Sequence, residues 1–182
     1  MTILSKNSKI IAATISLLLM CSIIACQQDK QNDNATEKSK TEVELMDYGP
    51  SPLVLDVEAA TLNNTNFRMT LWTGKELQVA LMSIPVGGEI GLEQHICGDQ
   101  FIRIEEGKAQ VLMGDSKESL TFNKTAEDDF AIFIPAGQWH IIINIGDKPL
   151  KIYSIYAPVE HPHSTIHKTF EEAEEAEAEH HK

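Results

Sequence analysis

The stretch GLEQHICGDQFIRIEEGKAQVLMG, residues 91–114, decides the fold. It contains two apolar runs of strand length, 100–106 and 108–114, which are separated only by Gly107. Both runs are rich in residues that favour strands, and a glycine between such runs is typical of a tight turn. No helical segment separates them. The stretch therefore predicts paired strands rather than alternating strands and helices.

The same pattern continues on both sides of this stretch. Short apolar segments recur between glycine, proline and asparagine turns, while helical periodicity is confined to one short turn at 58–62. The predicted strands are 53–57, 67–72, 77–84, 89–95, 100–106, 108–114, 118–122, 130–134, 139–144 and 150–157. Many short strands with no helices between them predict an all-β fold, an antiparallel sandwich or barrel.

The two ends of the chain differ from this central part in composition. Residues 1–25 hold Lys6 and Lys9 and then an apolar run shorter than the roughly 20 residues that span a bilayer, which is typical of a secretory signal peptide. The segment ends in IIAC, which resembles the lipobox of bacterial lipoproteins, where Cys26 would be lipidated. An uncleaved signal anchor is the alternative. Either way we expect an exported, membrane-tethered protein.

Four regions follow from these differences: a lipoprotein signal peptide at 1–25, a flexible polar tether at 26–44, a folded domain at 45–168 and an acidic C-terminal tail at 169–182. The tail is rich in alanine and glutamate and is predicted to form a short solvated helix. Gln27 follows the cysteine, so by the lipoprotein resemblance we expect a lipid-anchored protein of the bacterial cell envelope. In a Gram-negative cell it would lie on the outer membrane and face the periplasm.

Charge and cysteine usage exclude several classes of protein. The 15 basic residues fall to 13 when residues 1–25 are removed, against 27 acidic ones, which leaves a formal charge of −14. Such a surface repels phosphate backbones, so we expect no nucleic-acid partner. Cys97 would be the one free thiol of the mature chain, and no intramolecular disulfide is expected.

Two blocks of residues resemble the two conserved motifs of the cupin superfamily. Their members are Gly87, Glu93, His95, Gln100 and Gly107 in the first block, and Asp129, Pro135, Gly137, His140 and Asn144 in the second. The likeness extends over about residues 45–168 and is greatest to small single-domain cupins of the kind labelled mannose-6-phosphate isomerase-like. It implies a cupin jelly-roll barrel of two antiparallel sheets, with a metal site formed by Glu93, His95, Gln100 and His140.

This chain departs from the cupin pattern at three positions. Glu93 stands where a histidine is usual, Gln100 replaces the usual glutamate, and Asp129 replaces a glycine. The first two changes compensate each other, because the set keeps one carboxylate and therefore one negative charge. The carboxylate has changed position within the site.

Strand geometry supports the same site without the family. Residues two apart share a face of a strand, so Glu93 and His95 point the same way. Two imidazoles and one carboxylate are typical ligands of a divalent metal ion, here Fe, Mn, Ni or Zn. Gln100 is expected to supply a weak oxygen ligand or to donate a hydrogen bond to one. The alternative is a degenerate cupin whose polar core residues hold no metal.

Several other residues need an interpretation. Arg103 is predicted to point outward, which weakens the case for a sugar-phosphate substrate, and Arg68 cannot be placed by alternation. Cys97 is expected to be a bystander. The segment 153–169 carries His161, His163 and His167 and either closes over the barrel mouth or wraps the outside of the barrel.

Two functions are compatible with these residues. The first is a metalloenzyme, an isomerase or dioxygenase acting on a small oxygen-rich substrate, in which Glu93 displaced from the metal acts as general base. The second is a non-catalytic sensor or carrier that binds a small molecule in the same cavity. A part of an envelope assembly is a third, weaker reading. Ile141, Ile143 and Ile145 would make an outer face apolar, so a homodimer is expected, with packing by the terminal segments as the alternative.

Overall fold

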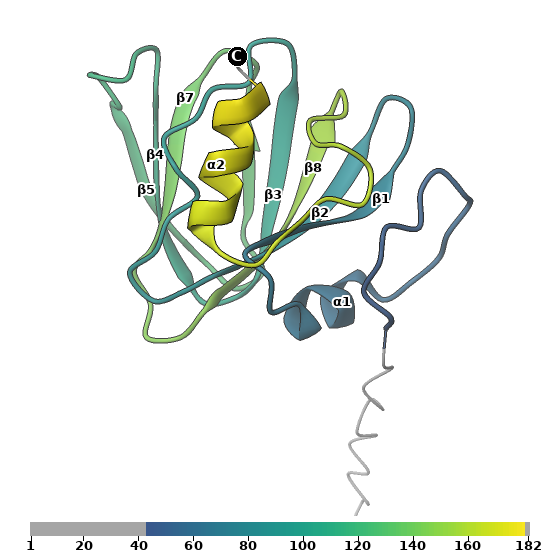
Figure 1. The fold of residues 1–182 in the computed structure, drawn as a ribbon. Helices are drawn as coiled ribbons and strands as arrows, with labels where there is room; N and C mark the ends of the chain where they lie inside the picture. Colours follow the sequence, from purple (N-terminus) through teal and green to yellow (C-terminus); the bar gives the residue numbers. More distant parts are fainter. Residues whose placement is uncertain (1–42, 181–182) are drawn as a thin grey trace, which may run out of the picture. The chain divides into compact units, whose positions relative to one another are not determined.

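The computed structural model describes residues 43–180. In this range there are two helices and nine strands, and the strands form two antiparallel sheets (Figure 1). The elements are α1 (Val57–Asn63), β1 (Arg68–Thr73), β2 (Gln78–Ile84), β3 (Asp99–Glu106), β4 (Lys108–Gly114), β5 (Phe122–Glu127), β6 (Ala131–Ile134), β7 (Trp139–Asn144), β8 (Leu150–Ala157), β9 (Ile166–His167) and α2 (Phe170–His180). The predicted all-β jelly roll of two antiparallel sheets with a short C-terminal helix is confirmed.

The larger sheet has the strand order β6-β3-β8-β2-β1-β9 and the smaller sheet the order β5-β4-β7. Neither helix in residues 43–180 combines the length and the apolarity needed to cross a bilayer. The predicted signal peptide, Cys26 and nearly all of the tether at 26–44 lie outside the described residues.

The core lies between the two sheets and changes character along the strands. Inward side chains such as Ile84, Ile104, Leu150 and Ile152 form an apolar cluster that is fully buried. Toward the other end of β2, β3 and β8 the buried side chains become polar, with Gln78, Gln100 and Ser154 all buried. A buried polar group is costly unless it finds a partner, so this end of the barrel is the place to look for a binding site.

Three predicted strands differ in the structure. Residues 53–56 form no strand, because Asp56 instead caps α1 by accepting a hydrogen bond from the Ala59 N–H at 3.1 Å. The predicted strand 118–122 is mostly a turn, closed by Ser119 N–H donating to the Ser116 carbonyl at 3.1 Å, and β5 begins only at Phe122.

The third difference concerns residues 89–95. This segment lies beside β7 but makes only two isolated bridges to it, Glu89 to Ile143 and Glu93 to His140. Gly91 lies between the two bridges with a φ of 95°, which L side chains rarely adopt and which interrupts a regular strand. The segment therefore lies along the β7 edge of the smaller sheet without forming a regular strand.

The C-terminal helix α2 is docked on the barrel rather than solvated on all sides. Phe170 packs against the apolar core and meets the ring of Phe67 edge-on at 5.5 Å, and Ala173 is 1% exposed. Figure 1 shows α2, in yellow, running alongside the strands. Alanine provides the buried stripe here, which is why the sequence of the tail looks polar throughout.

A buried carboxylate clamps the segment that follows β8. The Oδ1 atom of Asp47 accepts hydrogen bonds from the N–H groups of Gly49 at 3.0 Å and Thr73 at 2.9 Å. Its Oδ2 atom accepts from the Thr73 hydroxyl at 2.6 Å and the Ser164 N–H at 3.1 Å. Asp47 thereby ties residues 158–165 to the end of β1. That segment carries two of the residues that face the site.

Candidate metal centre

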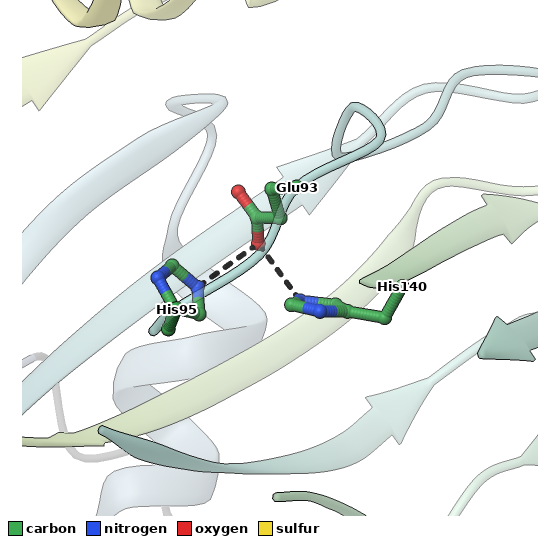
Figure 2. A group of neighbouring side chains, drawn as sticks. All are labelled: Glu93, His95 and His140. Carbon is green, nitrogen blue, oxygen red and sulfur yellow. Dashed lines mark hydrogen bonds and ion pairs between the residues drawn. The ribbon is translucent and has the colours of Figure 1, made fainter. Parts of the chain in front are cut away.

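Three side chains converge at the polar end of the barrel. Glu93, His95 and His140 each offer one ligand atom, and these atoms lie within 4.8 Å of one another (Figure 2). The Glu93 Oε1 atom is 3.2 Å from His140 Nε2 and 3.5 Å from His95 Nε2. His140 is fully buried, and the other two are largely buried. The structure thus brings together three of the four predicted ligands.

Backbone pairing explains why they meet. Glu93 and His140 are bridge partners that exchange two backbone hydrogen bonds, at 3.0 and 2.9 Å. Side chains directly opposite each other on paired segments lie close together. His95 is two residues farther along on the same face, and its carbonyl accepts from the Gly137 N–H at 2.8 Å. The turn before β7 is therefore fastened to the segment that carries the other two ligands.

The Nδ1 atom of each imidazole, on the side away from Glu93, lies close to a hydrogen-bond acceptor. His140 Nδ1 lies 3.1 Å from the Gln138 carbonyl oxygen, and His95 Nδ1 lies 3.2 Å from Glu160 Oε1. A carbonyl or a carboxylate only accepts, so both Nδ1 atoms must carry the proton. In the neutral form both Nε2 atoms then present a lone pair. Such partners are typical of histidines that ligate metals.

The three atoms at the centre are consequently all acceptors. Two Nε2 lone pairs and the Glu93 Oε1 face one another, and His95 Nε2 has no hydrogen-bond partner among the described residues. Acceptors held this close repel unless a positive charge lies between them, either protons on the imidazoles or a metal ion. The donor set fits a divalent cation such as Fe, Mn, Ni or Zn.

The electrostatics of the three side chains agree with this need for positive charge. Burial alone would raise the pKa of Glu93, but the close contacts with His140 and His95 and the charge of Arg68 outweigh it and hold the pKa well below its usual range. Burial would lower the pKa of His95, yet the nearby carboxylates of Glu160 and Glu93 raise it to about 10. A carboxylate with so low a pKa is a good ligand and a poor general base.

Gln100, the fourth predicted ligand, is buried on β3. Its amide Nε2 donates to the Ser154 hydroxyl at 2.9 Å, and its Oε1 has no hydrogen-bond partner among the described residues. An unpaired buried carbonyl oxygen is unusual and needs an explanation. A free oxygen of this kind is compatible with a fourth ligand, and the assignment of Gln100 as a ligand stays a prediction.

Glu93 and His95 border an open pocket of about 690 Å³, and His140 lies fully buried behind them. Its other walls come from Trp139, Glu160, His161, Lys117 and Glu177, together with Leu92, Gln94, Ile96 and Pro162. The Lys117 ammonium lies 4.5 Å from the centre of the Trp139 ring, a cation–π contact at the rim. A volume of this size admits a small molecule next to Glu93 and His95.

The remaining sequence predictions have mixed outcomes. Arg103 points outward and pairs with Glu105 at 2.9 Å, and Cys97 is exposed, as expected. Of the three loop histidines, His161 lines the pocket, whereas His163 bonds to the Gly49 carbonyl at 3.0 Å on the exterior. His167 lies in β9, opposite Arg68. The segment after β8 therefore faces the site with one histidine and fastens the outside with another.

Sequence reasoning missed Glu160, Glu177 and the placement of Arg68. Arg68 is 1% exposed, and its Nη2 lies 3.9 Å from Glu93 Oε2, so the carboxylate faces the histidines with one oxygen and a guanidinium with the other. An arginine inside an apolar strand was the available signal, because a buried charge requires partners.

The backbone explains the motif positions as well. Gly107 has a φ of 104°, and Asp129, which replaces a motif glycine, has a φ of 69°. Aspartate is one of the few residues that tolerate this left-handed conformation. The position therefore keeps its backbone requirement while its side chain pairs with Arg103.

Comparison with known proteins agrees with the fold and with the two sequence motifs. Residues 80–156 match the model of the Cupin domain family. The uncharacterized protein YrkC of Bacillus subtilis (strain 168) is 53% identical over 133 residues, which are 73% of this chain and 72% of YrkC. The uncharacterized protein L612 of Acanthamoeba polyphaga mimivirus is 39% identical over 114 residues, 62% of this chain and 69% of that protein.

A solved structure is also similar. The crystal structure of BH2720 from Bacillus halodurans superposes with a TM-score of 0.72 at 52% sequence identity. The match covers 72% of this chain and 99% of that protein. At this identity the likeness concerns the sequence as well as the fold.

Proposed function

This chain belongs to the cupin superfamily, and on that premise we propose that it is a metal-dependent enzyme, an isomerase or dioxygenase, acting on a small oxygen-rich molecule. One observation carries the proposal: both histidines are fixed by acceptors behind them, so three acceptor atoms converge where a cation is needed. The finer label of mannose-6-phosphate isomerase-like activity rests on the sequence resemblance alone, and an outward Arg103 does not support it.

The chain's own residues divide the work. Glu93, His95 and His140 would hold the divalent ion, with Gln100 as a fourth oxygen donor. The bound ion would act as a Lewis acid on an oxygen pair of the substrate. Glu160 and the Gln138 carbonyl orient the two imidazoles, and the pocket bordered by Trp139 and His161 would seat the substrate.

A non-catalytic binding module, a sensor or carrier, is the second candidate. It is favoured by the state of Glu93, whose two oxygens face two histidines and an arginine and whose pKa lies well below its usual range. Such a carboxylate accepts a proton poorly, so Glu93 is ill suited to the role of general base. A binder needs the metal and the pocket but no base.

Two further parts of the proposal concern location and assembly. The chain would be anchored to the bacterial envelope through a lipid on Cys26, on the outer membrane in a Gram-negative cell, with residues 26–44 as the tether. Homodimer formation is supported by apolar side chains left on the surface, among them Phe133 at 71% exposed and Ile145 at 46%.

Elemental analysis of the untagged full chain in mild detergent tests the metal. We expect about one Fe, Mn, Ni or Zn ion per chain, and loss of that ion in His140→Ala and Glu93→Gln. His163→Ala is the matched control, because it removes a histidine outside the site. A metal-free wild type, or His140→Ala with an undiminished metal content, would overturn the proposal.

Catalysis and binding are then separated on the metal-loaded protein. Thermal shifts against sugars, flavonoids and dicarboxylates identify ligands, and an oxygen electrode together with product analysis detects turnover. Turnover that is lost in His140→Ala supports the enzyme. Stabilisation by a ligand without turnover supports the binding module.

A further inference from the structure

Arg68 is the feature of the site that metal binding leaves unexplained. It lies on β1 next to the ligands and is fully buried, and its guanidinium carries a permanent charge with five N–H donors. Nη1 lies 2.5 Å from Glu177 Oε1, Nη2 lies 3.9 Å from Glu93 Oε2, and Nε has no hydrogen-bond partner among the described residues. A buried arginine with donors to spare is unusual, because each unpaired donor is costly.

Glu177 is the exchangeable partner of this arginine. Its side chain comes from the last turns of α2, is 38% exposed and borders the pocket, whereas Glu93 is held among the metal ligands. A half-exposed ion pair is weak compared with a buried one, since water competes for both charges. The carboxylate of Glu177 therefore occupies a position that opens to the pocket and that another carboxylate can take.

His161 adds a second polar group to the pocket that Glu177 borders. It lines the pocket, its ring meets Tyr156 edge-on at 5.1 Å, and its buried Nε2 has no hydrogen-bond partner among the described residues. The same pocket is bordered by Glu177, the ion-pair partner of Arg68. Arg68 and His161 thus leave two buried nitrogens unpaired.

We propose that Arg68 and His161 bind a carboxylate of the small-molecule ligand, at the position that the Glu177 carboxylate takes in this structure. This inference rests on the proposed function, because the other oxygens of the same ligand would meet the metal held by Glu93, His95 and His140. A guanidinium recognises a carboxylate through parallel hydrogen bonds, which a neutral group does not match. Glu177 stands in for the ligand.

The spacing narrows the ligand class. Glu93 lies between the guanidinium and the histidines: one of its oxygens faces Arg68 at 3.9 Å and the other faces His140 at 3.2 Å. A ligand that uses both positions needs metal-binding oxygens at one end and a separate carboxylate a few bonds away. Small hydroxylated or oxo dicarboxylates have this form.

Two related acids serve as probes. L-Malate and L-lactate share the 2-hydroxy acid that chelates a metal, and malate alone carries a second carboxylate. Their dissociation constants are measured by calorimetry on the Mn²⁺-loaded full chain after a Mn²⁺ titration. In Glu177→Gln we expect malate to bind about tenfold more tightly than in the wild type, because the competing charge is gone, with lactate within about twofold.

Glu175→Gln is the matched control, since it removes the same charge from an exposed position of the same helix. It should leave both constants within about twofold of the wild type. Arg68→Lys keeps the charge but loses the planar fork, and should reduce the preference for malate over lactate about tenfold. Circular dichroism verifies that each variant is folded, and Glu177→Gln is decisive even if Arg68→Lys does not fold.

A malate-to-lactate ratio that is the same in Glu177→Gln, Glu175→Gln and the wild type overturns the inference. Failure of the proposed function is seen separately, as an absence of Mn²⁺ binding in the first titration. In that event the malate titration is repeated on the metal-free variants, where tighter binding in Glu177→Gln still supports a carboxylate position on Arg68 and equal binding rejects it.

Discussion

Asp47 should contribute measurably to stability, and its contribution can be worked out from its hydrogen bonds. Burial alone would raise the pKa of Asp47, but the hydrogen bonds from the Thr73 hydroxyl and the Ser164 and Gly49 N–H groups outweigh it and lower the pKa from 3.8 to about 2. The side chain is 0% exposed, so solvent screens these bonds little. At about 1.4 kcal/mol per pKa unit, the shift corresponds to about 2.5 kcal/mol of stability at neutral pH.

The sign of the pH dependence follows from the direction of the shift. A lowered pKa in the folded state stabilises the protein fully above the unfolded value of 3.8 and is lost as the pH falls through about 2. Asp47→Asn should therefore be about 2.5 kcal/mol less stable than the wild type at pH 7, and the difference should shrink to about half at pH 3.

Urea unfolding at pH 7 and pH 3, followed by tryptophan fluorescence, measures both differences. Asp99→Asn is the control, because Asp99 is exposed and accepts a single hydrogen bond, from the Ala136 N–H at 2.9 Å. It should lose less than about 1 kcal/mol. A stability loss in Asp47→Asn that is no larger than in Asp99→Asn, or that does not change with pH, would refute the reasoning.

Three further predictions concern the site and the fold. Glu160→Gln should weaken metal affinity roughly tenfold or more in a competition titration, since the amide orients His95 less firmly, and an unchanged affinity would count against the orienting role. Asp129→Val should lower the free energy of unfolding by about 1–2 kcal/mol and Asp129→Gly by less, because glycine adopts the positive φ without strain and a β-branched residue does not; equal losses in urea melts would contradict this. Ala173→Glu should detach α2 and expose it to limited proteolysis, and unchanged cleavage would mean that burial of Ala173 does not hold the helix.

Much of the fold could be predicted from short-range patterns. The strands from β3 to β4 and from β7 to β8 follow from alternating or continuous apolar runs between turn residues, and the glycines of the motifs mark backbone positions with positive φ. The segment 53–57 was misread because Leu55 and Val57 pack against the outer-face cluster without forming a strand, while Leu53 and Val54 are exposed. Apolar content indicates burial and does not by itself specify a strand.

The candidate site could be predicted only in part, because some of its residues are far apart in the sequence. Glu93 and His95 are neighbours, and His140 belongs to a recognisable motif. Arg68 and Glu177 are 109 residues apart and meet only because α2 docks beside β1. No local pattern encodes such a pair. The face of α2 that docks on the barrel consists of alanines among glutamates. A hydropathy pattern does not identify such a face, because the segment is polar on average.

The two imidazoles of the site differ in what holds them, and this limits how the site can change. His95 is oriented by the side chain of Glu160, whereas His140 is oriented by the main-chain carbonyl of Gln138. A substitution at position 160 can strengthen or relax the first, but no replacement at position 138 removes a carbonyl that every amino acid possesses. Selection, natural or in the laboratory, can therefore adjust the grip on an ion through one histidine while the other stays constant.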